Sequence, residues 1–351
     1  MRFGVVILLL LVQFTSKAQS KFFGNDLFIG DGQMPSVSSG SNDDIHVAFG
    51  KGDSIMYASS IDGGKSFNSP VCVDTIANLV AFATRGPQVV VTKETIAIVA
   101  LNQDGDIFSY TRPLSGKWTR GTRVNDTDTI AKEGFVSISN DGIKNVFAVW
   151  LDLRGNRRNK IYGALSADGG KTWGSNKLIY ASVDSTVCEC CKPSVAVSGN
   201  KVYVMFRNWL NGNRDLYLIQ SNDGGKTFGE AVKLGIESWA LNGCPMDGGD
   251  IAVNDKGGPE TVWRRKNTIY SCSPGQQEVA IGEGRSCVME SVNGKSIYGW
   301  IENGKVVILK PGQVRQVMGE GSSPVITSTG KDQALCVWEN EKQIHSSIIK
   351  L

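Results

Sequence analysis

Cysteines are the residues of this chain whose spacing most clearly suggests chemistry. Five of the eight fall in three short segments: Cys188-Glu189-Cys190-Cys191, Cys244 and Cys287. Neighbouring cysteines bridge each other only with strain, so at least one of the first group needs a partner elsewhere. Three alternatives are open. These are disulfides such as Cys190 to Cys244, a thiolate site for a soft ion such as Cu(I) or Zn(II), and a reactive redox pair.

Arginines and aspartates form the second group of chemically capable residues. Arginine pairs bidentately with carboxylates, so a cluster of arginines could hold an acidic ligand. The candidate ligand-binding arginines are Arg85, Arg154, Arg207, Arg264 and Arg285. The candidate catalytic acids are Asp152 and Asp247. The chain has only two histidines, which argues against a histidine-based metal centre or a Ser-His-Asp triad.

The first 18 residues have the pattern of a signal peptide. Arg2 precedes an apolar run at 5–12 that is too short to span a membrane, and Ser16-Lys17-Ala18 provides a cleavage site after Ala18. We therefore expect an exported protein, periplasmic or secreted, that comprises residues 19–351 and has no transmembrane anchor. Its cysteines would meet an oxidising compartment, which favours disulfides over a metal.

Charge and composition exclude some partners. The formal charge of +3 falls to +1 without Arg2 and Lys17, the only charged residues among the first 18. So small a charge does not attract nucleic acid or anionic membranes in bulk. With 41% hydrophobic and 20% charged residues, the chain can form a folded core, and we expect a monomer.

The elements that must position these residues are repeated strand pairs. Seven times, two short strands are joined by a turn, and the second strand carries a large apolar residue near its end. These residues lie 37 to 57 positions apart and are Phe49, Leu101, Trp150, Phe206, Trp263, Trp300 and Trp338. No long stretch has a helical apolar period. The repeats predict one all-β domain, a seven-bladed β-propeller closed by residues 26–30, with six blades as the alternative because the last two units are short.

Three turns carry a more specific motif. Ser60-Ile61-Asp62-Gly63-Gly64-Lys65-Ser66-Phe67 recurs from Ser166 to Trp173 and again from Ser221 to Phe228. The motif matches the Asp-box, S-x-D-x-G-x-T-W, so the chain resembles the sialidase-like Asp-box (BNR-repeat) propellers. That resemblance implies structural Asp-boxes on the face opposite the active site. It also implies three arginines around an acidic sugar, a tyrosine nucleophile activated by a glutamate, and an aspartate as general acid/base.

The sequence departs from this family at two points. Gln33-Met34-Pro35 stands where the family has Arg-Ile-Pro, and no tyrosine falls at the expected mouth of the propeller. In a propeller, the segments that lead into the first strands and out of the second strands gather on one face. We predict a protein that binds a glycan, an acidic ligand or a soft metal through an arginine-lined, cysteine-rich mouth. An exo-α-sialidase or related glycoside hydrolase is the alternative, and a protein-interaction platform is a third.

Overall fold

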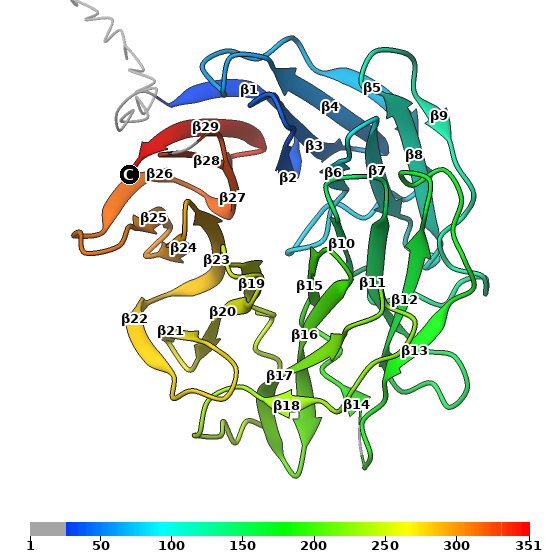
Figure 1. The fold of residues 1–351 in the computed structure, drawn as a ribbon, viewed down its shortest axis with the longest axis vertical. Helices are drawn as coiled ribbons and strands as arrows, with labels where there is room; N and C mark the ends of the chain where they lie inside the picture. The colour runs from blue at the N-terminus through cyan, green and yellow to red at the C-terminus, as the bar shows by residue number, and fades with distance from the viewer. Residues whose placement is uncertain (1–25, 185, 331) are drawn as a thin grey trace, which may run out of the picture.

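The computed structural model describes residues 26–184, 186–330 and 332–351. The predicted signal peptide, 1–18, lies outside these residues. The described chain forms seven antiparallel sheets, the blades, arranged in a ring around one axis (Figure 1). No helix occurs in these three ranges, so none could cross a membrane. The all-β, seven-bladed prediction is confirmed, and the six-bladed alternative is wrong.

The first four blades follow one another along the chain. Blade 1 contains β2 (Gln33–Ser39), β3 (Ile45–Lys51), β4 (Ser54–Ser60) and β5 (Val71–Thr75). Blade 2 contains β6 (Gln88–Val91), β7 (Thr95–Leu101), β8 (Ile107–Pro113) and β9 (Thr119–Arg120). Blade 3 contains β10 (Val136–Asn140), β11 (Val146–Asp152), β12 (Lys160–Ser166) and β13 (Lys177–Tyr180). Blade 4 has five strands, β14 (Thr186–Val187), β15 (Ser194–Ser198), β16 (Lys201–Leu210), β17 (Asn213–Ser221) and β18 (Val232–Lys233).

The last three blades complete the ring. Blade 5 contains β19 (Asp250–Val253), β20 (Pro259–Arg265), β21 (Thr268–Cys272) and β22 (Val279–Glu283). Blade 6 contains β23 (Arg285–Val292), β24 (Lys295–Glu302), β25 (Lys305–Leu309) and β26 (Gln316–Glu320). Blade 7 contains β27 (Ser322–Ser328), β28 (Gln333–Asn340), β29 (Gln343–Lys350) and β1 (Leu27–Asp31). Pairing of β1 with β29 joins the first and last strands of the described chain in one sheet, as the sequence predicted (Figure 1).

The seven repeated apolar residues form the packing between blades. Each lies in the second strand of its blade and is at most 3% exposed. Five of them stand two residues before the strand ends. Phe206 differs because β16 continues for four more residues, to Leu210, and there pairs with the additional strand β14. Large buried side chains at equivalent positions fill the wedge between neighbouring sheets, so the repeat in the sequence determines the number of blades.

The Asp-box turns connect third to fourth strands and pack on the preceding blade. Asp168 Oδ1 accepts hydrogen bonds from Ser166 Oγ (2.8 Å) and from the backbone N–H of Thr172 (2.9 Å). Ser109 Oγ of blade 2 donates to the carbonyl of Gly170 at 2.5 Å. Gly170 has φ +92°, and a Cβ there would lie 2.8 Å from Ala97, so only glycine fits. The turns at Asp62 and Asp223 have the same aspartate bonds.

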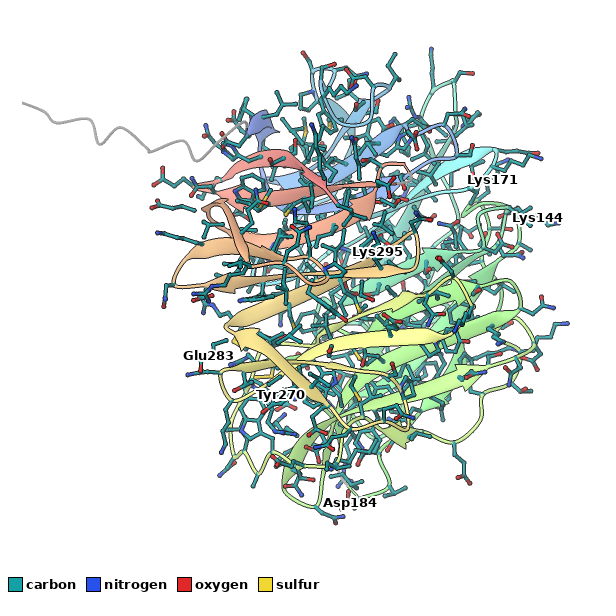
Figure 2. The ribbon with its side chains drawn as sticks, turned by 60° about the vertical axis from the view of Figure 1, so that its left-hand side comes forward. Lys144, Lys171, Asp184, Tyr270, Glu283 and Lys295 are labelled. Atoms are coloured by element: carbon teal, nitrogen blue, oxygen red, sulfur yellow. A yellow bond between two sulfur atoms is a disulfide. The ribbon has the colours of Figure 1, made fainter. Side chains whose placement is uncertain are left out.

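The two faces of the ring are formed by different segments of the blades. Lys171, in an Asp-box turn, and Lys144, in the turn between β10 and β11, lie at one side of the molecule in Figure 2. Glu283, where β22 ends, lies at the opposite side (Figure 2). The face with the Asp-box turns is therefore opposite the face on which the innermost strands begin. We call this second face the mouth.

We expect Asp168→Ala to destabilise the propeller by about 2 kcal/mol, because the change leaves several donors of a tight turn without an acceptor. Urea unfolding would measure the change. Asp104→Ala is the matched control, since Asp104 is exposed in a turn without an Asp-box and has no side-chain partner among the described residues. An equal, small effect of both substitutions would contradict a structural role for the Asp-box.

Candidate functional site

A cavity of about 240 Å³ lies on the propeller axis at the mouth. Residues at or just before the starts of the innermost strands of blades 1, 2, 4, 5, 6 and 7 line it, together with Ile138 of blade 3. Its walls are partly apolar, with Val37, Val89 and Val288 among them. Segments far apart in the sequence thus converge on one cavity, as propeller topology predicts.

Lys192 brings a positive charge into this cavity. Its Nζ reaches from the start of blade 4 to Gln88 of β6 and donates to Oε1 at 2.8 Å. An ammonium group has three donors, and Gln88 is its one acceptor within residues 26–184, 186–330 and 332–351. Burial lowers the pKa of Lys192, while the charge of Asp250 acts in the opposite direction.

Asp250 places a carboxylate on the lining of the same cavity. Its Oδ1 accepts from the backbone N–H of Ile251 at 2.9 Å, and its Oδ2 accepts from that of Met289 at 3.1 Å. Burial raises the pKa of Asp250, although these amides and Lys192 oppose the shift. Because Lys192 and Asp250 have opposite charges, the cavity is close to neutral when both are ionised.

Asp247 also lines the cavity but is already paired. Its Oδ2 accepts from Arg264 Nε and from the backbone N–H of Ser286, both at 2.9 Å. Its Oδ1 accepts from the backbone N–H of Gly249 at 3.3 Å. The predicted role of Asp247 as a catalytic acid stays a prediction, and these contacts account for the residue as an organiser of the loop before β19.

The structure engages four of the five predicted ligand-binding arginines in contacts within the protein. Arg207 donates to three backbone carbonyls, those of Asp247, Arg214 and Arg264. Arg264 binds Asp247 and two backbone carbonyls, those of Lys266 and Pro245. Arg85 donates to the carbonyls of Glu133 and Ala83 and stacks on Phe135. Only the exposed Arg285 has no side-chain partner within the described ranges, so of the five it is the one whose guanidinium donors are all available.

Arg154 and Asp152 form a bidentate ion pair. Arg154 Nε donates to Asp152 Oδ1 at 2.9 Å, and Arg154 Nη2 donates to Oδ2 at 2.8 Å. Trp150 Nε1 donates to Asp152 Oδ2 at 2.9 Å, and the carboxylate is fully buried. The predicted roles of Asp152 in catalysis and of Arg154 in ligand binding stay predictions. The contacts are those of an ion pair between a buried carboxylate and a partly exposed guanidinium, at the end of β11.

The cysteines converge at the junction of blades 4 and 5. Cys190 and Cys244 form a disulfide, with Cα atoms 6.1 Å apart. Cys188 Sγ lies 3.3 Å from Cys191 Sγ and 3.7 Å from Cys190 Sγ, and the sulfurs of Cys190 and Cys191 are 4.0 Å apart. Cys287 lies apart from this group and places its Sγ 4.0 Å from Asp247 Oδ1. Four of the five predicted cysteines therefore share one site.

Arg214 of β17 also belongs to this sulfur site, and it is not among the arginines predicted from the sequence. Its Nη1 donates to Cys188 Sγ at 2.9 Å and to Glu189 Oε2 at 3.2 Å. A hydrogen bond with Cys191 and the charge of Arg214 lower the pKa of Cys188 to about 7. Burial and the neighbouring Cys188 raise the pKa of Cys191.

Sequence reasoning also missed Lys192, for which a signal existed. Lys192 directly follows the cysteine segment in a stretch that leads into a first strand, where a propeller turns side chains toward its axis. Arg214 had a weaker signal. It lies opposite Trp209 in the hairpin of β16 and β17, and its distance to Cys188 depends on β14, which no periodicity indicated.

The eight tyrosines bear on the hydrolase alternative. All eight lie in second, third or fourth strands, and none lines the axial cavity. Tyr270 of β21, labelled in Figure 2, stacks instead on Trp263 at a centroid distance of 5.1 Å. The cavity therefore offers no tyrosine nucleophile.

Comparison with known proteins places this architecture among the propellers. No family model and no curated protein matches the sequence. The BP39L lectin from Burkholderia pseudomallei matches with a TM-score of 0.65 at 10% identity, over 92% of this chain and 97% of the lectin. An ulvan lyase of polysaccharide lyase family PL25 matches with a TM-score of 0.57 at 11% identity, over 92% and 95%. An α-L-arabinanase from Penicillium chrysogenum matches with a TM-score of 0.54 at 12% identity, over 93% and 97%.

These matches place the chain in the class of single-chain β-propellers, and each covers more than nine tenths of the chain. At 10 to 12% identity they show the fold and no activity.

Proposed function

We propose that this protein binds a carbohydrate, and that a neutral sugar of about monosaccharide size occupies the axial cavity. The observation that carries the proposal is the pair Lys192 and Asp250 on the lining of one partly apolar cavity. An ammonium with unused donors and a carboxylate can bind neighbouring hydroxyl groups, while apolar walls contact the C–H face of a sugar ring.

Size and charge narrow the ligand class. The cavity of about 240 Å³ is smaller than the ~300–1,000 Å³ of pockets for drug-sized molecules. Because the charges of Lys192 and Asp250 offset each other, a neutral polyol fits better than a strongly acidic sugar. Proteins with similar folds include a lectin, an α-L-arabinanase and a polysaccharide lyase, which agrees with a carbohydrate ligand. No observation favours the sialidase alternative, since the cavity has no tyrosine and four of the arginines are engaged.

Two further parts of the proposal concern the protein family and the export of the protein. We propose a divergent member of the Asp-box propellers, supported by three turns with the same aspartate hydrogen bonds. We also propose export with loss of residues 1–18, which the disulfide between Cys190 and Cys244 supports because such bonds persist in oxidising compartments.

Calorimetric titration with a panel of neutral monosaccharides and their uronic acids tests the binding proposal. We expect Lys192→Met to weaken sugar binding at least tenfold, since about 1.4 kcal/mol of hydrogen bonding corresponds to that factor. Lys295→Met is the matched control, because Lys295 is exposed where β24 begins (Figure 2). Equal affinity in both variants would contradict the site, and a preference for uronic acids would contradict a neutral ligand.

A further inference from the structure

Three sulfur atoms at the junction of blades 4 and 5 lie within the dimensions of a metal–thiolate site, and a fourth is attached to one of them. Those of Cys188, Cys190 and Cys191 are 3.3, 3.7 and 4.0 Å apart, and Cys244 is bonded to Cys190. A tetrahedral ion with metal–sulfur bonds of ~2.3 Å separates its ligands by ~3.8 Å. The three distances between sulfurs that are not bonded to each other bracket that value. Cys188, Cys190 and Cys191 therefore need almost no movement to bind one ion.

Local backbone structure fixes these sulfurs in place. The N–H of Cys188 donates to the carbonyl of Arg207 at 2.9 Å, which ties the segment to β16. Cys188, Cys190 and Cys191 are at most 7% exposed, whereas Cys244 is exposed. The group is therefore closed on the protein side and accessible through Cys244, which gives an ion a path of entry.

The charges around the sulfurs favour an anionic complex. Arg207 is 1% exposed, its donors meet neutral carbonyls, and no carboxylate lies within ion-pair distance among the described residues. A buried cation of this kind needs an opposite charge nearby. Arg214 is also buried and donates directly to Cys188 Sγ. Four thiolates around a divalent ion carry a net charge of −2. The two guanidinium groups offset most of this charge, and Glu189, which pairs with Arg214, contributes one further negative charge.

We propose that Cys188, Cys190, Cys191 and Cys244 bind one soft d¹⁰ ion, Zn(II) or Cu(I), once the Cys190–Cys244 disulfide is reduced. A dithiol reductant would supply two electrons and two protons. It becomes a disulfide itself, and Cys190 and Cys244 become thiols. Binding of Zn(II) then breaks four S–H bonds, forms four Zn–S bonds and releases four protons to solvent. The disulfide form is the metal-free state of the same site, so the redox state determines whether the ion binds.

Metal titration of the mature chain, 19–351, tests this proposal. Protein reduced under anaerobic conditions is titrated with Zn(II) or Cu(I) against a competing chelator, and Co(II) serves as a spectroscopic probe of tetrahedral thiolate ligation. We expect one tightly held ion per reduced chain, none in the oxidised chain, and the absorption of a Co(II) tetrathiolate complex.

Two variants and one control make the test specific. We expect Cys191→Ser and Cys244→Ser each to lower metal affinity at least a hundredfold; Cys244 is exposed, so its replacement should leave the fold intact. Cys72→Ser in β5 is the control, because Cys72 is a free, exposed cysteine outside this site. Unchanged affinity in both variants would overturn the proposal. So would a reduced protein that binds no ion and instead reoxidises to a Cys188–Cys191 disulfide, which would identify a redox pair.

Discussion

Arg207→Met is expected to destabilise the propeller by about 3–5 kcal/mol, because buried carbonyls that lose a charged donor keep the full cost of their desolvation. Arg207 donates to the carbonyl of Arg214 in β17 of blade 4. It also donates to the carbonyls of Asp247, just before blade 5, and of Arg264, in β20 of blade 5. Its guanidinium also lies over Trp239, 5.4 Å from the ring centroid. Methionine retains the apolar length of the side chain and none of the donors, so the loss of stability reports the hydrogen bonds together with the guanidinium contact to Trp239.

Urea unfolding of the variant and the wild type measures this effect through the midpoint at an unchanged slope. Arg285→Met is the matched control, since Arg285 is exposed and without a described partner; we expect a change within ~0.5 kcal/mol. Arg207→Lys should recover little stability, because an ammonium cannot reach three separated carbonyls as a planar guanidinium does. A loss below ~1 kcal/mol for Arg207→Met would show that Arg207 is not a structural connection between blades.

Arg207 also shows a feature that the sequence repeat could not predict, the position at which a strand ends. The apolar period placed Phe206 correctly in a second strand, but it does not determine where that strand ends. Since β16 continues to Leu210 and pairs with β14, Arg207 lies within the ladder and not in a loop at the mouth. Arg264 and Asp152 are likewise the penultimate and last residues of β20 and β11. The sequence thus predicts these charged residues near strand ends as ligand-binding or catalytic, whereas in the structure they form contacts that join strands and loops.

The features that the sequence predicted well depend on local or repeated information. The Asp-box turns are determined by bonds within five residues, as from Asp62 to Ser66. Hydrogen bonds from Ser66 and Ser60 lower the pKa of Asp62 to about 2, which shows how completely the turn satisfies its carboxylate. The approach of Cys190 to Cys244 could be anticipated because consecutive blades are neighbours. Contacts across the ring, such as that between Lys192 and Gln88, have no such signal in a single sequence.

The second large effect concerns Glu290 of β23 and the dependence of stability on pH. Burial and the nearby charge of Asp250 raise the pKa of Glu290 to about 7, from 4.5, although backbone N–H groups of Ser291 and Ser328 oppose the shift. Because the folded pKa is higher than the unfolded one, the native state prefers the protonated carboxyl group. Ionisation of Glu290 therefore costs the folded state stability. This cost is absent below about pH 4.5, develops as the pH rises toward 7, and is complete above 7.

We therefore expect Glu290→Gln to stabilise the protein at pH 8.5 by about 2 kcal/mol, a value reduced from the full linkage because the side chain is only half-buried. At pH 4.5 the substitution should be nearly neutral, since the wild-type side chain is then protonated and resembles glutamine in shape. Unfolding midpoints at both pH values measure the difference, with the exposed Glu341→Gln as the matched control. If Glu290→Gln changed stability equally at both pH values, the effect would come from packing. Ionisation next to Asp250 would then not limit the stability of the inner strands.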